Sequence, residues 1–313
     1  MAKKTTKNII PFVTSPLINF FNAMKIRGLM SKIDSGISAG GSTLYDKNRD
    51  IIKSLFDPAI PYNVDVVYKR LVVIDALYST NMNQRYYGIE DMANTIYALS
   101  PSDAGLRVLV CNFRNKLFSV VFPDVSSDPI AKVFDKDYGI HKNLKSAGSA
   151  MSLLSKYFYF LLLTDPSEKI GFPIYDSLAS DMYPIVCKYV YASGTPRKIV
   201  NVKTIDHLCD YFLALDQLRN SIGIFSIGGR SLQEFDLLDA YLWRMGKFNG
   251  NNFSLLLDKT GYTTLIGTAG AAGMKSENVI KKLGEYRKSN GCPSLRANPL
   301  FANLWDHAKA LGI

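Results

Sequence analysis

Seven consecutive apolar residues, Tyr157 to Leu163, constrain the fold of this chain more than any other feature. Such a run is too apolar for a protein surface, so it predicts an element that is buried against the rest of the chain. Lys156 lies at the head of the run. A charged amine beside a buried element is costly unless it extends to solvent, pairs with an acid or has a chemical task.

The residues before the run predict where the buried helix begins. If Ser152 or Ser155 caps this helix, Lys156 lies in its first turn, where the helix dipole and burial both favour the neutral, nucleophilic amine. A lysine that forms a Schiff base needs that form. For Lys156 considered alone, an ordinary surface lysine is the alternative interpretation.

The residues after the run predict a loop and a second helix. Pro166, Gly171 and Pro173 are helix breakers, and Asp176 then lies at the start of the helix-like stretch SLASDMYPIVCKYV. A carboxylate there is stabilised as the anion by free backbone N–H groups, so it can support positive charge on a substrate. A simple N-cap is the alternative interpretation of Asp176.

Most of the chain has the apolar spacing of helices rather than of strands. In residues 63–78 the apolar side chains of Val67, Leu71 and Ile74 fall on one helical face. Similar helix-like stretches are residues 89–99, 203–223 and 231–247. Alternation of apolar and polar residues is scarce, so we predict a mainly α protein.

The net charge of +10 is concentrated at the two ends of the chain. Residues 1–60 carry nine Lys and Arg against four Asp and Glu, and residues 241–313 carry ten against four. Basic ends favour a polyanionic partner, because Lys and Arg that neutralise phosphates release counterions; solubility alone is the alternative. We predict a basic N-terminal extension (1–60), a helical core (61–247) and a basic C-terminal module (248–313).

The C-terminal module contains a basic segment, SENVIKKLGEYRK, which predicts a helix capped by Ser276. Lys281 and Lys282 on this helix are candidates for contacts with a phosphate backbone. A solvated helix face explains the same charges equally well.

Cysteine and histidine spacing excludes several classes of protein. The four cysteines and three histidines are scattered, and none has the spacing of a zinc or iron–sulfur motif, so we expect no metal and no cofactor.

No apolar run approaches the roughly 20 residues that cross a bilayer, and Pro11 interrupts the short apolar part of the first residues. We expect a soluble, cytoplasmic monomer with no membrane partner, associated with the nucleoid if the source is bacterial.

With these residues in view, the chain resembles the helix-hairpin-helix DNA glycosylases, specifically the 8-oxoguanine DNA glycosylase-like branch and its bacterial relatives. In that family a nucleophilic lysine opens a buried helix, and an aspartate follows a Pro-containing loop and begins the next helix. Lys156 and the Asp176 of FPIYDS match this pattern. The segment LYSTNMNQR resembles the one in which an asparagine enters the space of the flipped base and an arginine contacts its widowed partner; Asn81 and Arg85 match these positions.

The resemblance spans roughly residues 60 to 247 and includes one departure. The family's hairpin usually carries a Gly-Val-Gly turn before the lysine, whereas this chain has SAMSLLSK, so Ser152 and Ser155 are expected to replace part of the contact with a DNA phosphate. The stretch FDLLDAYLW resembles the helix that closes the core in bacterial relatives. By that analogy Phe235 is a candidate for the base pocket, and Tyr175, beside Asp176, is a second.

The resemblance implies a fold of helical subdomains flanking a catalytic cleft, and an enzyme that flips a damaged or modified base out of double-stranded DNA and excises it. Lys156 would attack C1′ and form a Schiff base that permits strand cleavage, while Asp176 would stabilise charge on the sugar. If Lys156 is not nucleophilic, Asp176 would activate water and leave an abasic site. The substrate base stays open, and modified bases of invading phage DNA are one hypothesis.

Two other functions stay open from the sequence. One is a non-catalytic DNA-binding protein that has kept a glycosylase-like fold, with Lys156 as a phosphate contact. The other is a helical scaffold that binds a partner protein.

Overall fold

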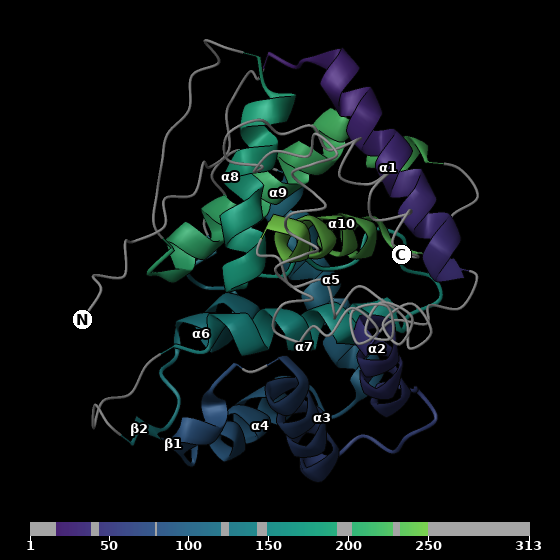
Figure 1. The fold of residues 1–313 in the computed structure, drawn as a ribbon. Coiled ribbons are helices and arrows are strands. Elements are labelled where there is room, and N and C mark those ends of the chain that lie inside the picture. Colours follow the sequence, from purple (N-terminus) through teal and green to yellow (C-terminus); the bar gives the residue numbers. More distant parts are fainter. Residues whose placement is uncertain are drawn as a thin grey trace, which may run out of the picture. The chain divides into compact units, whose positions relative to one another are not determined.

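The computed structural model describes residues 17–38, 44–78, 80–119, 125–142, 149–192, 202–227 and 232–249. These residues are mainly helical, which confirms the prediction of a mainly α protein (Figure 1). The longer helices are α1 (Phe20–Ser38), α2 (Leu44–Leu55), α3 (Val64–Tyr78), α4 (Gly88–Leu99), α5 (Asp103–Ser119), α6 (Pro129–Asp135), α7 (Met151–Leu163), α8 (Ser177–Val190), α9 (Ile205–Ile222) and α10 (Glu234–Asn249). The short elements are the 3-10 helices η1 (Met82–Gln84) and η2 (Ile224–Ser226) and the strands β1 (Arg85–Tyr86) and β2 (Ile140–His141).

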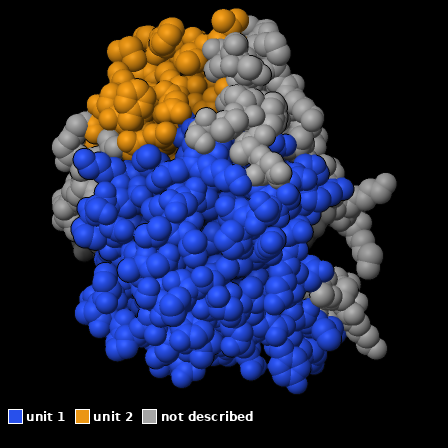
Figure 2. Space-filling model, turned by 180° about the vertical axis from the view of Figure 1, so that it is seen from behind, with its two compact units in different colours: residues 1–12, 50–176, 198–216 blue, residues 13–49, 177–197, 217–313 orange. Residues whose placement is uncertain are grey.

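The chain divides into two compact units (Figure 2). Unit 1 comprises residues 1–12, 50–176 and 198–216, and unit 2 comprises residues 13–49, 177–197 and 217–313. These limits do not coincide with the predicted boundaries at residues 60 and 247, because the units follow packing whereas the prediction followed charge along the sequence. Residues 250–313, nearly all of the predicted C-terminal module, lie outside the described residues.

In unit 2 the helix α1, which belongs to the predicted N-terminal extension, packs against α8 and α10. Its side chains Ala23, Ile26 and Met30 are buried. An ion pair joins Arg49 of α2 to Asp236 of α10 at 2.5 Å, and both side chains are buried. These contacts make α1 part of the packed unit instead of an appendage.

Unit 1 is built around α7. This helix packs against α3 and α5, α3 also packs against α4, and α6 packs against α4 and α5. Every side chain from Tyr157 to Leu162 is completely buried, as the apolar run predicted. Aromatic rings fill the surrounding core; the ring of Phe158, for example, meets those of Phe134 and Phe172 edge to face at 5.5 and 5.8 Å.

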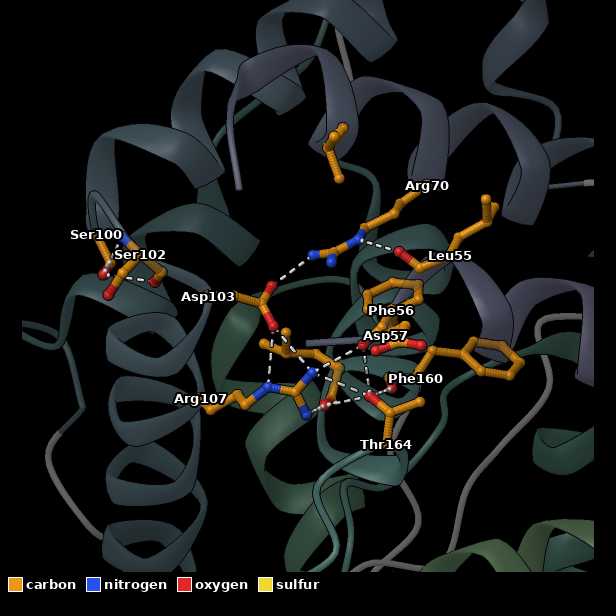
Figure 3. Close-up of polar contacts among 12 residues, drawn as sticks. Leu55, Phe56, Asp57, Arg70, Ser100, Ser102, Asp103, Arg107, Phe160 and Thr164 are labelled. Atoms are coloured by element: carbon orange, nitrogen blue, oxygen red, sulfur yellow. Dashed lines mark hydrogen bonds and ion pairs between the residues drawn. The ribbon is translucent and has the colours of Figure 1, made fainter. Parts of the chain in front are cut away.

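A buried charge cluster fixes the C-terminal end of α7 (Figure 3). Asp103 of α5 pairs with Arg107 at 2.9 Å and with Arg70 of α3 at 2.5 Å. Arg107 donates to the carbonyl oxygen of Leu161 in the last turn of α7, and Arg70 donates to the carbonyl oxygen of Leu55 at the end of α2 (2.9 Å). Two buried guanidinium groups share one carboxylate, which leaves one positive charge unbalanced. The carbonyl oxygens at the C-terminal ends of α2 and α7, which carry partial negative charge, supply part of the balance.

Among the described helices, none has both the length and the apolar character that crossing a membrane requires.

The helical spacing in residues 63–78 and 89–99 corresponds to α3 and α4, which are joined by a short irregular segment containing η1 and β1. β1 pairs antiparallel with β2, with Arg85 opposite His141 and Tyr86 opposite Ile140. This two-stranded ladder holds the chain that links α3 to α4.

Candidate functional site

Lys156 and Asp176, which the sequence predicts to share one site, lie together in unit 1. The Lys156 Nζ is 3.3 Å from Asp176 Oδ2 and donates a hydrogen bond to Ser152 Oγ at 2.9 Å. It also lies over the ring of Tyr78, 5.5 Å from its centroid. The Lys156 side chain is only 2% exposed and that of Asp176 is 20% exposed, so the amine is covered while the carboxylate is partly open to solvent.

The predicted start of the lysine helix is wrong. α7 begins at Met151, its N-cap residue is Ala150, and no side chain caps it. Ser152 is therefore inside the helix, and Lys156 is the sixth residue of α7 instead of a first-turn residue. Residues four positions apart share a helical face, which explains why the Ser152 hydroxyl reaches the Lys156 amine.

Ser155 is completely buried and is not placed to contact a phosphate, contrary to its predicted role. Its Oγ accepts a hydrogen bond from the backbone N–H of Tyr175 at 3.0 Å and donates to the carbonyl oxygen of Ser152 at 3.1 Å. The hydroxyl thus ties the stretch before Asp176 to α7. Ser155 positions the carboxylate beside the amine.

The loop between α7 and Asp176 is organised by Glu168. Its Oε1 accepts backbone hydrogen bonds from Ile170 (2.7 Å) and Gly171 (3.1 Å) and pairs with Arg114 at 2.9 Å. Burial acts to raise the pKa of Glu168, but Arg114 and the two N–H groups outweigh it and lower the pKa below its ordinary value. These contacts therefore fix the conformation of the loop that leads to Asp176.

A pocket of about 400 Å³ opens at the N-terminal end of α7. Its lining includes Arg85, Ser152, Tyr175 and Lys203, together with the first residues of α7. Ser152 binds the Lys156 amine and Tyr175 directly precedes Asp176, so the ion pair lies just behind this wall. The pocket combines positive charge, an uncapped helix N-terminus and hydroxyl groups, which suits an anionic or polar ligand.

Tyr175 supplies an aromatic and a hydroxyl group to this pocket. Its ring packs edge to face against Tyr211 at 5.4 Å. Burial, and then the negative charge of Asp176, raise the pKa of the Tyr175 hydroxyl above its ordinary value. The hydroxyl therefore stays protonated at neutral pH and is available as a hydrogen-bond donor.

Asp75, at the end of α3, organises the segment that contains Asn81. Its Oδ1 accepts from the Thr80 hydroxyl and from the backbone N–H of Met82 (2.9 Å), and its Oδ2 accepts from the N–H of Asn83 (3.0 Å). We did not predict this role. The only signal in the sequence is a carboxylate a few residues before a Ser-, Thr- and Asn-rich segment, a pattern typical of turns.

Arg85 lines the pocket, and Asn81 is exposed between two lining residues, Thr80 and Met82. Arg85 donates to the carbonyl oxygens of Tyr138 (3.3 Å) and Ser149 (3.2 Å). Burial lowers the pKa of its guanidinium, which nevertheless stays charged at neutral pH.

The backbone of this segment adopts the left-handed conformation at both ends. Among the described residues, the two non-glycine residues with positive φ are Asn81 (φ 64°) and Tyr87 (φ 59°). Asparagine tolerates the left-handed region, but a tyrosine there is uncommon and requires its surroundings to impose it. Strain of this kind is concentrated at functional sites, so it indicates that the geometry of residues 81–87 has a use.

The other predicted binding residues are Phe235 and two lysines near the C-terminal end of the chain. Phe235 belongs to unit 2, where it is 2% exposed and lies 5.7 Å from the Arg219 guanidinium, which makes it a core residue there. Lys281 and Lys282 lie outside the described residues. In the part of the chain that the structure describes, no group of three His, Cys, Asp or Glu side chains is arranged to hold a metal ion.

Comparisons with protein-family models, curated proteins and solved structures find no match to this chain. The geometry of the Lys156–Asp176 pair and its pocket is therefore the basis on which a function is argued.

Proposed function

We propose that this protein is a DNA glycosylase of the helix-hairpin-helix type, which removes a damaged or modified base from double-stranded DNA. The observation that carries the proposal is the 3.3 Å pairing of the Lys156 amine with the Asp176 carboxylate beside a pocket of about 400 Å³. A nucleophile and a carboxylate close behind the wall of one pocket are the groups that cleavage of an N-glycosidic bond through a cationic sugar requires.

The proposed reaction begins with a nucleotide rotated out of the duplex into the pocket. Lys156 gives a proton to Asp176, which passes it to the departing base, so the base leaves neutral with the electron pair of the glycosidic bond and Asp176 is a carboxylate again. The free Lys156 amine then attacks C1′ and loses a proton. The anionic oxygen atoms of Asp176 stabilise positive charge on the sugar until the new C–N bond forms. Loss of the ring oxygen from C1′ gives an imine, which water hydrolyses or which eliminates the 3′ phosphate.

The burial of Lys156 sets a condition on this route. Because the amine is covered by Ser152, it must leave that hydroxyl and turn toward the pocket before it can reach C1′. If it does not, the more exposed Asp176 acts alone, activates a water molecule as general base and leaves an abasic site. Both routes release the same free base, and they differ in the covalent intermediate.

Binding of the DNA backbone is supported by three features of the pocket rim. Arg85 and Lys203 provide positive charge, the uncapped first turn of α7 provides free backbone N–H groups, and Asn81 is exposed for insertion into the duplex. The non-catalytic alternative also requires a movement of Lys156. It uses Lys156 as a phosphate contact, and a side chain that is 2% exposed cannot make one without leaving its partners.

The proposal is tested by measuring free base released from duplexes that carry 8-oxoguanine or hypermodified cytosines. We expect release by the unaltered protein, a loss of at least about 100-fold in Asp176→Asn, and no change in Lys169→Ala, whose lysine is exposed outside the pocket. Strong binding to every duplex without release of any base would contradict the proposal and support a non-catalytic DNA-binding protein.

A further inference from the structure

The N-terminal half of α1, in unit 2, presents an apolar face that the packed unit leaves largely exposed. It consists of Leu17, just before the helix (61% exposed), and of Phe20, Phe21 and Met24 (74%, 67% and 62% exposed). The three helical residues are three to four positions apart and so share one side of α1. Grouped apolar side chains with this exposure mark an interaction surface. We propose that the apolar face of α1 attaches the protein to the surface of an anionic phospholipid bilayer.

The exposure of the apolar face is fixed by the fold, because the start of α1 is bonded to the end of α8 (Figure 1). The backbone N–H of Asn19 donates to the carbonyl oxygen of Val190 at 2.8 Å, and the N–H of Ala192 donates to the carbonyl oxygen of Leu17 at 2.8 Å. The first turn of α1 cannot rotate to bury its phenylalanines without breaking these bonds. The fold therefore holds apolar side chains in water, which is unfavourable unless a partner covers them.

Positive charge lies beside the apolar face. The Lys25 Nζ is 4.4 Å from the centroid of the Phe21 ring, and Lys188 is exposed in the last turn of α8, close to the start of α1. Residues 1–33 contain six Lys and Arg and no Asp or Glu, and the first acidic residue, Asp34, is buried. Apolar side chains next to cations are the combination that binds the interface of anionic lipids.

Other occupants fit this face less well. Duplex DNA would engage the lysines but has no apolar surface for Leu17 and Met24. A second copy of the chain would cover apolar side chains, but a twofold pairing centred on Phe21 would bring two Lys25 amines together. A bilayer accepts both kinds of group, because apolar side chains enter the acyl boundary while the amines stay among the phosphates.

Attachment to a bilayer surface requires no helix that spans the bilayer. The sequence predicts no membrane partner because no apolar run is long enough to cross, and the described helices agree with that. An interfacial face enters only about 5–10 Å, to the boundary of headgroups and acyl chains. The inference therefore changes the expectation from no membrane partner to a peripheral one, and it does not depend on the proposed function.

The test is sedimentation of the full chain with vesicles made of equal parts of phosphatidylglycerol and phosphatidylcholine. We expect binding to these vesicles and much weaker binding to phosphatidylcholine alone, because the lysines require anionic headgroups. Phe20→Ser/Phe21→Ser should bind the anionic vesicles at least about tenfold more weakly, since two rings lose their burial. Ile51→Ser/Val108→Ser is the matched control. It changes two exposed apolar residues of α2 and α5 (53% and 58%) and should bind like the unaltered protein.

A second variant tests the contribution of charge without changing the apolar face. Lys25→Gln should bind the anionic vesicles about fivefold more weakly, as expected for the loss of one cation near a charged bilayer. Lys69→Gln is its control, because Lys69 is an exposed lysine of α3 in unit 1. Circular dichroism of every variant shows whether its helices are retained.

Three results would overturn the inference. The first is an absence of binding to anionic vesicles, or equal binding by the two double variants. The second is a mass of two chains in solution that falls to one chain in Phe20→Ser/Phe21→Ser, which would assign the face to a second copy. The third is a loss of duplex binding in that variant, which would assign the face to nucleic acid. Base release from duplexes should be unchanged in Phe20→Ser/Phe21→Ser, so failure of the vesicle test leaves the proposed function standing.

Discussion

At the scale of single residues, substitutions of Lys156 and of Asp176 should change the free energy of unfolding by different amounts, because the amine is more deeply buried than the carboxylate. Asp176→Ala removes the carboxylate from an almost fully buried amine, and loss of one partner of a buried pair typically costs about 3–5 kcal/mol. Lys156→Met replaces the amine with an apolar chain of similar length in an apolar surrounding. We expect it to change the free energy of unfolding by less than about 1.5 kcal/mol while it abolishes any Schiff base.

Urea unfolding of the two variants measures this difference. The double variant Lys156→Met/Asp176→Ala is the control, and it should recover most of the stability that Asp176→Ala loses. Equal destabilisation by Asp176→Ala and Lys156→Met would contradict the description of a buried amine that depends on a partly exposed carboxylate.

A second prediction at this scale concerns the dependence of stability on pH through Glu168. Its pKa is lowered in the folded protein from an ordinary value of 4.5, so the unfolded chain binds the proton more readily. The contribution of Glu168 to stability is therefore complete above about pH 4.5 and is lost as the pH falls through the lower, folded-state pKa.

Glu168→Gln should be clearly less stable than the unaltered protein at pH 7, and the two should converge as the pH is lowered below 4.5. Denaturant unfolding at a series of pH values measures this convergence. A difference in stability that stays constant down to pH 3 would contradict the assignment of the ion pair with Arg114.

At the scale of elements, the C-terminal end of α7 depends on one carboxylate. Asp103→Asn removes the charge that Arg70 and Arg107 share, and we expect the free energy of unfolding to fall by about 3 kcal/mol or more. Asp65→Asn is the matched control, since Asp65 is an exposed aspartate in the first turn of α3, and it should stay within about 0.5 kcal/mol. Similar effects of the two substitutions in thermal unfolding would contradict a structural role for the cluster in Figure 3.

The elements also show how far the sequence alone could lead. The apolar run predicted that α7 is buried, and the spacing of Val67, Leu71 and Ile74 predicted α3, because burial and helical period are local properties. The start of α7 was predicted wrongly, since Ser152 is inside the helix and contacts Lys156 instead of capping. The proximity of Lys156 to Asp176 was predicted from a resemblance of motifs, whereas the buried tether of Ser155 required the fold to be known.

The Asp75 carboxylate and the Asp103 cluster show the limit of prediction from sequence. Each depends on hydrogen bonds to backbone groups of a segment that packs against it only in the folded chain. Composition cannot distinguish these residues from other aspartates. Similarly, the charged ends of the sequence indicated three parts, but packing grouped α1 with α8 and α10.

At the scale of the whole molecule, a net charge of +10 predicts binding to DNA that weakens as salt is added. Arg85→Ala and Lys203→Ala should each reduce the slope of log K against log salt by about one unit, because each removes one cation that is proposed to contact a phosphate at the rim of the pocket near Lys156. Lys156→Ala should leave the slope unchanged, since its amine is buried. Fluorescence anisotropy at several salt concentrations measures these slopes, and a reduced slope in Lys156→Ala would instead support a phosphate contact.

The measurement that tests the central claim most directly is borohydride trapping on duplexes that carry 8-oxoguanine, an abasic site or hypermodified cytosines. Borohydride reduces an imine between Lys156 and C1′ to a stable covalent adduct. We predict an adduct with the unaltered protein that disappears in Lys156→Ala and persists in Lys169→Ala. Free base without an adduct would leave Asp176 as the catalytic group of a monofunctional enzyme. An adduct that persists in Lys156→Ala, or binding with neither product on any duplex, would contradict the proposed role of this lysine.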